Sequence, residues 1–253
     1  MNFSGKVAIS TGAASGMGLL FAENFAALGG NVVMCDVNEA VLIEKAEEIN
    51  KKGAGRAVIC VCDVRDYAQV CAARDLAVET FGSLDVVANF AGGTAVRMCK
   101  VDREKYPEFP DIPIEVYDWG IDVNLKGPFY FAHAALKQMR EQRSGIIINI
   151  GSISGIEGDH VGIEYPTSKS GLMFGFTRSI AQFGAPYGIR CVCISPGPVL
   201  TRAAMANMKT MLGRAADPQE IIDLCLYVIS DKGAFINGEN IMIDGGRAAM
   251  KRG

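Results

Sequence analysis

TGAASGMG, residues 11–18, follows the short apolar run Lys6–Ser10 and opens a helical pattern over Met17–Leu28. Its glycines stand at positions 12, 16 and 18. Glycine lets the backbone adopt positive φ angles and approach a ligand closely. The amino end of the next helix offers free amide hydrogens to a phosphate. The turn is therefore a candidate pyrophosphate cradle, although its G-x-x-x-G-x-G spacing alone also suits a plain strand-to-helix turn.

Apolar runs and helical patterns alternate along the rest of the chain. Six further runs are predicted strands: Asn31–Asp36, Ala57–Cys62, Leu84–Asn89, Gly145–Ile150, Ile189–Ile194 and Asn240–Ile243. Helices are predicted at Glu39–Lys52, Tyr67–Phe81, Val116–Gln142, Thr167–Phe183 and Pro218–Ile229. Continuous apolar strands are typical of a parallel sheet covered on both faces. The chain is therefore predicted to be α/β: one doubly wound, Rossmann-like domain over residues 1–253, with a seven-stranded, mostly parallel sheet and helices on both faces.

Composition argues against several classes of protein. The 253 residues carry a net charge of −3, which gives no reason to expect a nucleic acid or an anionic membrane as partner. No apolar run is long enough for a membrane span, and the first residues lack a secretory signal, so a cytoplasmic location is expected. The eight cysteines have only His133 and His160 as possible histidine co-ligands. We therefore expect no metal site and read the cysteines as packing residues.

Asp36 ends the second predicted strand. A carboxylate there can accept hydrogen bonds from adenosine ribose hydroxyls and would repel the 2′-phosphate of NADP. Neither the glycine turn nor the neighbour of Asp36 is basic, since position 15 is Ser and position 37 is Val. This pattern favours NAD over NADP.

YPTSK, residues 165–169, places Tyr165 and Lys169 four positions apart, on one face of a helix. A free Tyr has a pKa near 10, too high for a good base at neutral pH. A neighbouring ammonium favours the phenolate, so we expect Lys169 to lower the pKa of Tyr165. Ser152 ends the fifth predicted strand and could donate a hydrogen bond to a substrate oxygen.

An ordered series of motifs resembles the short-chain dehydrogenase/reductase family across nearly the whole chain. TGAASGMG is similar to its glycine turn, Asp63-Val64 to its adenine-contacting pair, and Asn89–Gly92 to its N-N-A-G, with Phe90 in place of the second Asn. Ser152, Tyr165 and Lys169 match its Ser…Tyr-x-x-x-Lys, and Asn124 falls where the family has a helix Asn. Pro196–Thr201 and Ile243–Gly246 resemble its P-G segment and closing strand.

The resemblance implies an oxidoreductase (EC 1.1.1.-) that moves a hydride between NAD(H) and a secondary alcohol or ketone. Tyr165 would be the acid/base, Ser152 would polarise the substrate oxygen, Lys169 would also reach the nicotinamide ribose, and Asn124 would hold a water connecting Lys169 to solvent. The implied cofactor-binding residues are Gly12, Ser15, Gly16, Met17, Gly18, Asp36, Val37, Asp63, Val64, Asn89, Ala91, Gly92, Tyr165, Lys169, Pro196, Gly197, Val199 and Thr201. The resemblance also implies a homotetramer, a dimer of dimers.

The substrate is left open by the sequence. It could be a polyol, a sugar derivative or a hydroxysterol; the alternatives are a 3-oxoacyl thioester reductase, or a catalytically silent NAD-binding regulator. Two segments should flank the reacting carbon: a longer loop at 93–116, whose prolines predict a non-helical excursion, and a substrate lid at 198–214. Candidate substrate residues are Arg97, Ser154, His160, Arg202 and Met205.

Overall fold

A seven-stranded sheet forms the centre of the molecule, and the computed structural model describes residues 1–250. The strands are β1 (Val7–Thr11), β2 (Asn31–Asp36), β3 (Ala57–Val61), β4 (Val86–Asn89), β5 (Gly145–Ile150), β6 (Ile189–Pro196) and β7 (Asn240–Ile243). Their order is β3-β2-β1-β4-β5-β6-β7, and every neighbouring pair is parallel. The predicted sheet is confirmed, and it is wholly rather than mostly parallel.

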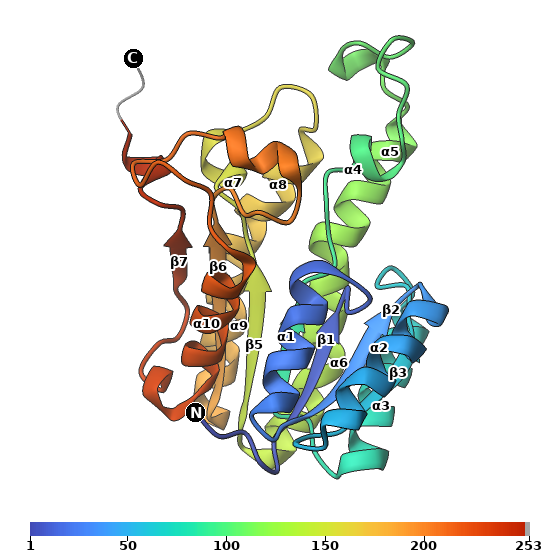
Figure 1. Cartoon of the computed structure of the whole chain (residues 1–253), viewed down its shortest axis with the longest axis vertical. Helices are drawn as coiled ribbons and strands as arrows, with labels where there is room; N and C mark the ends of the chain where they lie inside the picture. Colours follow the sequence, from blue (N-terminus) through green and yellow to red (C-terminus); the bar gives the residue numbers. More distant parts are fainter. Residues whose placement is uncertain (251–253) are drawn as a thin grey trace.

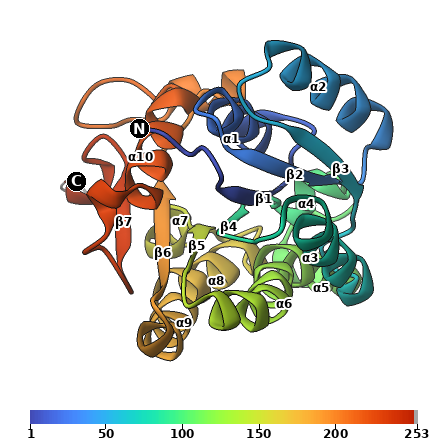
Figure 2. The same ribbon diagram turned by 90° about the horizontal axis from the view of Figure 1, so that it is seen from below.

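Helices cover both faces of this sheet (Figure 2). One face carries α1 (Gly16–Ala27), α2 (Glu39–Lys52) and α10 (Pro218–Ile229). The other carries α3 (Tyr67–Phe81), α6 (Gly127–Gln142) and α9 (Thr177–Gly184). Side chains alternate along each strand, so Val32 and Met34 pack against the first layer while Val33 and Cys35 pack against the second. This double burial is why the strands read as continuous apolar runs.

The two long predicted helices are each built from three pieces. The first consists of α5 (Ile114–Ile121), a wide π turn η2 (Asp122–Lys126) and α6. The second consists of α8 (Glu164–Gly171), a π turn η3 (Leu172–Phe176) and α9. Because α8 begins at Glu164 rather than Thr167, Tyr165 lies within its first turn. Pro166 suits that position, since the first helical amides need no partner.

Short helices and loops gather at the carboxyl ends of the strands, at the top of Figure 1. The non-helical loop predicted at 93–116 is partly wrong, because it contains α4 (Ala95–Met98) and the 3-10 turn η1 (Phe109–Asp111). Between these elements the chain projects away from the body (Figure 1). α7 (Ser154–Glu157) follows β5, and the 3-10 turn η5 (Ala203–Asn207) lies within the predicted lid. Further 3-10 turns are η4 (Ala185–Tyr187), η6 (Asp231–Gly233) and η7 (Arg247–Ala249).

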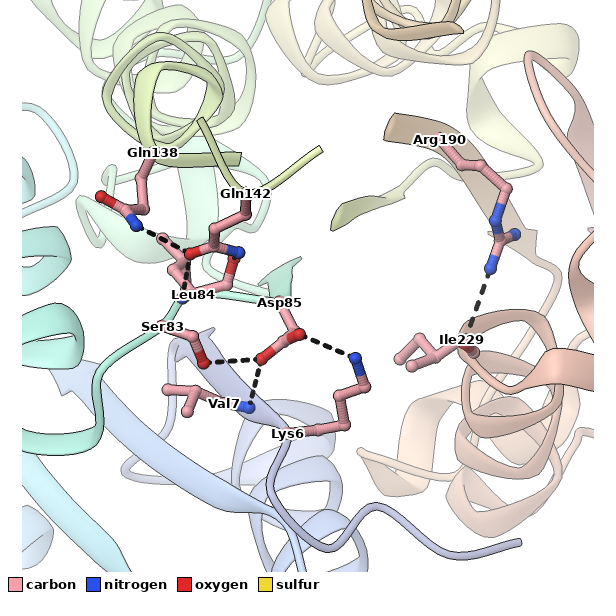
Figure 3. Close-up of polar contacts among 9 residues, drawn as sticks. All are labelled: Lys6, Val7, Ser83, Leu84, Asp85, Gln138, Gln142, Arg190 and Ile229. Carbon is pink, nitrogen blue, oxygen red and sulfur yellow. Dashed lines mark hydrogen bonds and ion pairs between the residues drawn. The ribbon is translucent and has the colours of Figure 1, made fainter. Parts of the chain in front are cut away.

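The amino edge of the sheet is held by polar contacts of Asp85, Gln142 and Arg190 (Figure 3). Asp85 accepts hydrogen bonds from Lys6 Nζ (2.9 Å), the Val7 amide (3.0 Å) and Ser83 Oγ (2.9 Å). Arg190 donates to carbonyl groups at the end of α10, including that of Val228 (2.8 Å). A cavity of about 430 Å³ opens at this edge, but its charged lining serves the fold.

Residues 1–250 contain neither a candidate membrane-spanning helix nor a candidate metal site. No helix there combines the length and apolar character that a membrane crossing requires. No group of three or more His, Cys, Asp or Glu side chains there is arranged to hold a metal ion.

Candidate active site

A second cavity, of about 580 Å³, lies at the opposite edge, where the chain leaves β1, β2, β3 and β4. This is the point where the sheet order reverses, between β1 and β4, and open parallel sheets bind ligands in that crevice. Twelve of the predicted cofactor residues line it: Gly12, Ser15, Gly16, Met17, Gly18, Asp36, Val37, Asp63, Val64, Ala91, Gly92 and Thr201. The predicted substrate residues Arg97 and Arg202 line it too.

The glycine turn is shaped by contacts that exclude side chains. A Cβ at Gly18 would lie 2.4 Å from the Gly12 carbonyl oxygen, so α1 and the turn can approach each other only with glycine there. A Cβ at Gly16 would meet no protein atom within 4 Å, and Gly16 lines the cavity. The space before the amino end of α1 is therefore open to an anionic group, as a pyrophosphate requires.

Asp36 connects the glycine turn to the end of β2. Its Oδ2 accepts a hydrogen bond from the Ala14 amide (3.1 Å), and its Oδ1 accepts one from the Asn38 amide (3.0 Å). A carboxylate has about four acceptor positions, so these two bonds leave others free on the cavity side. The residues present therefore fit an adenosine ribose at this place.

Arg65 is a cavity residue that the sequence analysis missed. It lines the cavity together with Asp36 and Val37, although it is distant from both in sequence. Its guanidinium binds the Asp63 carboxylate through three hydrogen bonds of 2.6 to 3.1 Å. This contact lowers the pKa of Asp63. The positive charge of Arg65, near Asp36, is thus neutralised by the Asp63 carboxylate.

Ser152, Tyr165 and Lys169 come together at the carboxyl end of β5. The Ser152 hydroxyl accepts a hydrogen bond from the Ser154 amide (3.1 Å), and Ser152 is close enough to Tyr165 to lower the pKa of its phenol. Lys169 Nζ lies 5.4 Å from the centre of the Tyr165 ring and donates to the Ile150 carbonyl (2.8 Å). The i, i+4 spacing on α8 accounts for the shared face of the last two residues.

Asn124 lies in the same cluster, fully buried in η2. Its side-chain amide accepts from the Gly93 amide (3.0 Å) and donates to the Gly93 carbonyl (2.9 Å) and the Gly120 carbonyl (2.8 Å). A Cβ on Gly92 would lie 2.7 Å from Asn124 Oδ1 and 3.4 Å from Lys169 Nζ. Gly92 lines the cavity, so Asn124 and Lys169 lie directly behind its wall.

The expectation that Lys169 lowers the pKa of Tyr165 is wrong for this structure. Burial raises the pKa of the phenol above its ordinary value, more than the hydrogen bond from Ser152 and the charges of Arg202 and Arg97 lower it. Burial also lowers the pKa of Lys169 to about 8. Desolvation disfavours the charged forms of both side chains, the phenolate of Tyr165 and the ammonium of Lys169.

Several predicted cofactor residues lie beside the cavity rather than on its wall. Asn89 is buried and donates to Asn149 Oδ1 (3.0 Å) within the sheet. Pro196 extends β6 beyond its predicted end, Gly197 packs on Asp244, and Val199 pairs with Ala216. Phe90, which replaces the family's second Asn, packs its ring 5.4 Å from that of Phe21.

The three remaining candidate substrate residues do not line the cavity. His160 is exposed in the loop before α8, and Ser154 begins α7. Met205 lies in η5, where its sulfur is 3.7 Å from the guanidinium of Arg202.

Glu164 acquires a structural importance that sequence reasoning missed. It is buried, and its Oε1 accepts the Ala95 amide (2.8 Å), which joins α8 to α4. Burial raises its pKa. The contact joins two elements that are 69 residues apart, so a sequence pattern does not predict it.

Comparison with known proteins agrees with this geometry. A family profile described as Enoyl-(Acyl carrier protein) reductase matches residues 12–248. The trans-4-hydroxycyclohexanecarboxylate dehydrogenase of Sinomonas cyclohexanicum is 38% identical, over 96% of this chain and 93% of its own.

The chain belongs to the short-chain dehydrogenase/reductase family.

Other short-chain dehydrogenases/reductases extend the comparison. A 3-alpha-(or 20-beta)-hydroxysteroid dehydrogenase of Mycobacterium tuberculosis is 35% identical, over 97% of this chain and 90% of its own. The crystal structure of a 3-oxoacyl-[acyl-carrier protein] reductase with bound NAD from Brucella melitensis aligns with a TM-score of 0.85 at 30% identity, over 96% and 91% of the two chains. The family is one of oxidoreductases that bind a nicotinamide cofactor, so the predicted family, fold and general class of activity are confirmed.

Proposed function

We propose that this protein is an NAD-dependent oxidoreductase that interconverts a secondary alcohol and a ketone, with Tyr165 as the acid/base. The observation that carries the proposal is the meeting of Ser152, Tyr165 and Lys169 beside a cavity that contains the glycine turn. Asp36 supports NAD over NADP, because its carboxylate faces the end of the cavity where a 2′-phosphate would lie.

Each residue of the cluster has a role that its environment favours. A bound nicotinamide cofactor would supply or accept the hydride. Tyr165, whose pKa is raised by burial, donates its proton to the ketone oxygen during reduction and takes it back during oxidation. Ser152 holds the same oxygen by a hydrogen bond as charge develops on it. Lys169, whose pKa is about 8, can exchange a proton near neutral pH and so return the phenol to its starting state.

Relatives support a hydroxyl-bearing substrate without choosing one. Their names include dehydrogenases of trans-4-hydroxycyclohexanecarboxylate, L-rhamnose and hydroxysteroids. A second candidate activity, reduction of a 3-oxoacyl thioester, is favoured by the aligned 3-oxoacyl-[acyl-carrier protein] reductase. Both activities use the same proton donor and differ in what the loops at 93–116 and 198–214 admit.

We further propose that a second copy of the chain covers the face formed by η2, α6 and η3. An apolar groove there is lined by Ile121, Leu125, Phe129, Gly171, Gly175, Phe176 and Ile180, and Phe129 is 51% exposed. Exposed apolar surface of this kind supports association of two copies about a two-fold axis, and a second two-fold contact on another face would complete a homotetramer.

A substrate panel tests the proposed activity. Purified protein with NAD, and separately with NADP, is offered polyols, sugars, hydroxy acids, hydroxysteroids and 3-hydroxyacyl thioesters, and the absorbance of the reduced cofactor is followed. Tyr165→Phe should lose at least about 10²-fold in turnover and still bind NADH. Tyr227→Phe, at an exposed tyrosine of α10, is the matched control and should match the unmodified protein. Unchanged turnover in Tyr165→Phe would remove the proposed role.

A further inference from the structure

Two arginines at the catalytic end of the cavity have no acidic partner among residues 1–250. Arg97 belongs to α4 and Arg202 immediately precedes η5, and both line the cavity that also contains Gly92. Neither forms an ion pair with a described residue. The Arg97 guanidinium lies over Gly93, where a Cβ would come within 2.8 Å of it.

Both guanidinium groups line the same cavity, beside the residues that hold the catalytic phenol. Partial desolvation lowers the pKa of Arg97, and the charge of Arg202 lowers it further. Both charges lower the pKa of Tyr165, so both lie within electrostatic reach of its hydroxyl. Both arginines are exposed to solvent, so both charges are accessible to an anion that enters the cavity.

The third arginine of the cavity shows that this arrangement is particular to the catalytic end. Arg65, at the adenosine end, is paired with Asp63 at 2.6 Å. A dinucleotide pyrophosphate would take the open amino end of α1 near Gly16, so it does not account for Arg97 and Arg202. The anion that they fit is one brought by the substrate.

We infer that Arg97 and Arg202 bind a carboxylate carried by the substrate, which makes the substrate a hydroxy acid or oxo acid. This inference rests on the proposed function of the same site. Guanidinium groups bind carboxylates through paired, charge-assisted hydrogen bonds. A phosphate would find fewer hydrogen-bond donors, because the first amide of α4, at Ala95, already donates to the buried carboxylate of Glu164.

Glu164 is a positioning residue in this arrangement. It directly precedes Tyr165 in α8, and its contact with Ala95 lies two residues before Arg97. The spacing between the proton donor and the first arginine is therefore set by a buried hydrogen bond. A substrate whose hydroxyl and carboxylate match that spacing is held at both ends.

The test compares hydroxy acids with their own neutral derivatives. We use 3-hydroxybutyrate and 4-hydroxycyclohexanecarboxylate, each against its methyl ester, together with a phosphate monoester of 1,4-cyclohexanediol. The expected result is that kcat/KM of at least one acid exceeds that of its ester by about tenfold or more, the effect of a charge-assisted hydrogen bond. In Arg97→Gln/Arg202→Gln this ratio should fall toward one, while Arg140→Gln, at the far end of α6, keeps it.

Three results would overturn the inference. The first is turnover of the esters as good as that of both acids, and the second is a preference for the phosphate monoester. The third is a weaker NADH affinity in the double arginine variant, measured by NADH fluorescence, because the arginines would then serve the cofactor.

Failure of the proposed function would look different, since no alcohol or ketone would be turned over. The carboxylate site is then judged by binding alone. 4-Oxocyclohexanecarboxylate, but not its methyl ester, should raise the thermal midpoint of the NADH complex, and the double variant should lose this effect. No stabilisation by the acid would overturn the site independently of catalysis.

Discussion

Replacing Asp36 by Ala should change the cofactor preference through two opposite effects. Two acceptor positions of the carboxylate are occupied by the Ala14 and Asn38 amides, which leaves about two for ribose hydroxyls. A hydrogen bond to a charged group contributes about 1.5–3 kcal/mol, so NAD binding should weaken by at least about tenfold. NADP loses a repulsion of about 1–4 kcal/mol for unit charges about 4 Å apart. The dissociation constant of NADP divided by that of NAD should therefore fall by about 10²-fold or more.

Fluorescence titrations with NADH and NADPH measure this ratio directly. The substitution also removes the bond that steadies Ala14 in the glycine turn. That loss weakens pyrophosphate binding equally for both cofactors, so it cancels in the ratio. A ratio within about twofold of that of the unmodified protein would refute the reasoning.

Asp63→Asn is the complementary variant. It releases Arg65 from its ion pair and offers a guanidinium at the same end of the cavity. NADPH affinity should rise, and the combined variant Asp36→Ala/Asp63→Asn should favour NADPH more than either single change. If NADPH affinity does not respond, Arg65 does not reach the 2′-phosphate.

Three further substitutions test other parts of the structure. Burial lowers the pKa of Lys169 from 10.5 to about 8, so between these pH values the unfolded chain binds a proton that the folded protein does not. The free energy of unfolding, measured with urea relative to Lys169→Met, should therefore rise by on the order of 3 kcal/mol as the pH increases through this interval. A difference that does not change with pH would contradict the shift. Gly120→Ala would place a Cβ 2.2 Å from Glu164 Cγ and should destabilise the protein by about 1–3 kcal/mol, whereas a raised thermal midpoint would show that helix propensity dominates. At Gly175 a Cβ meets no protein atom within 4 Å, so Gly175→Arg should fold in one copy yet dissociate the proposed assembly in sedimentation measurements. An unchanged assembly would place the interface elsewhere.

The sheet and its helices were predictable because a strand buried on both faces needs a continuous run of apolar residues, which is visible in the sequence. Val32 and Met34 face one helical layer and Val33 and Cys35 face the other, so all four buried residues of β2 are apolar. The glycine turn and the Ser–Tyr–Lys cluster were predictable for a different reason: each chemical step restricts the residue type and its distance along the chain.

What could not be predicted depends on contacts between distant residues. The pairing of Arg65 with Asp63 decides whether a cation is available at the adenosine end, and a sequence does not record it. The upward shift of the Tyr165 pKa arises from burial by the surrounding fold, while the Lys169 spacing alone suggested the opposite. The π turns within the two long helices keep an ordinary apolar pattern, so they were also missed.

The π turn η2 has a consequence for how this protein tolerates insertions and deletions. The Gly127 amide bonds the Asp122 carbonyl five residues back, so the turn holds one residue more than an α-helical turn. One residue of an α-helix corresponds to a rotation of about 100°, and this sets the angular phase of α6 relative to α5. Asn124 therefore faces the catalytic cluster while Phe129 faces the apolar groove. Deleting one residue between 122 and 126 would restore a regular helix without shortening any loop, yet it would turn one of these two faces away from its target.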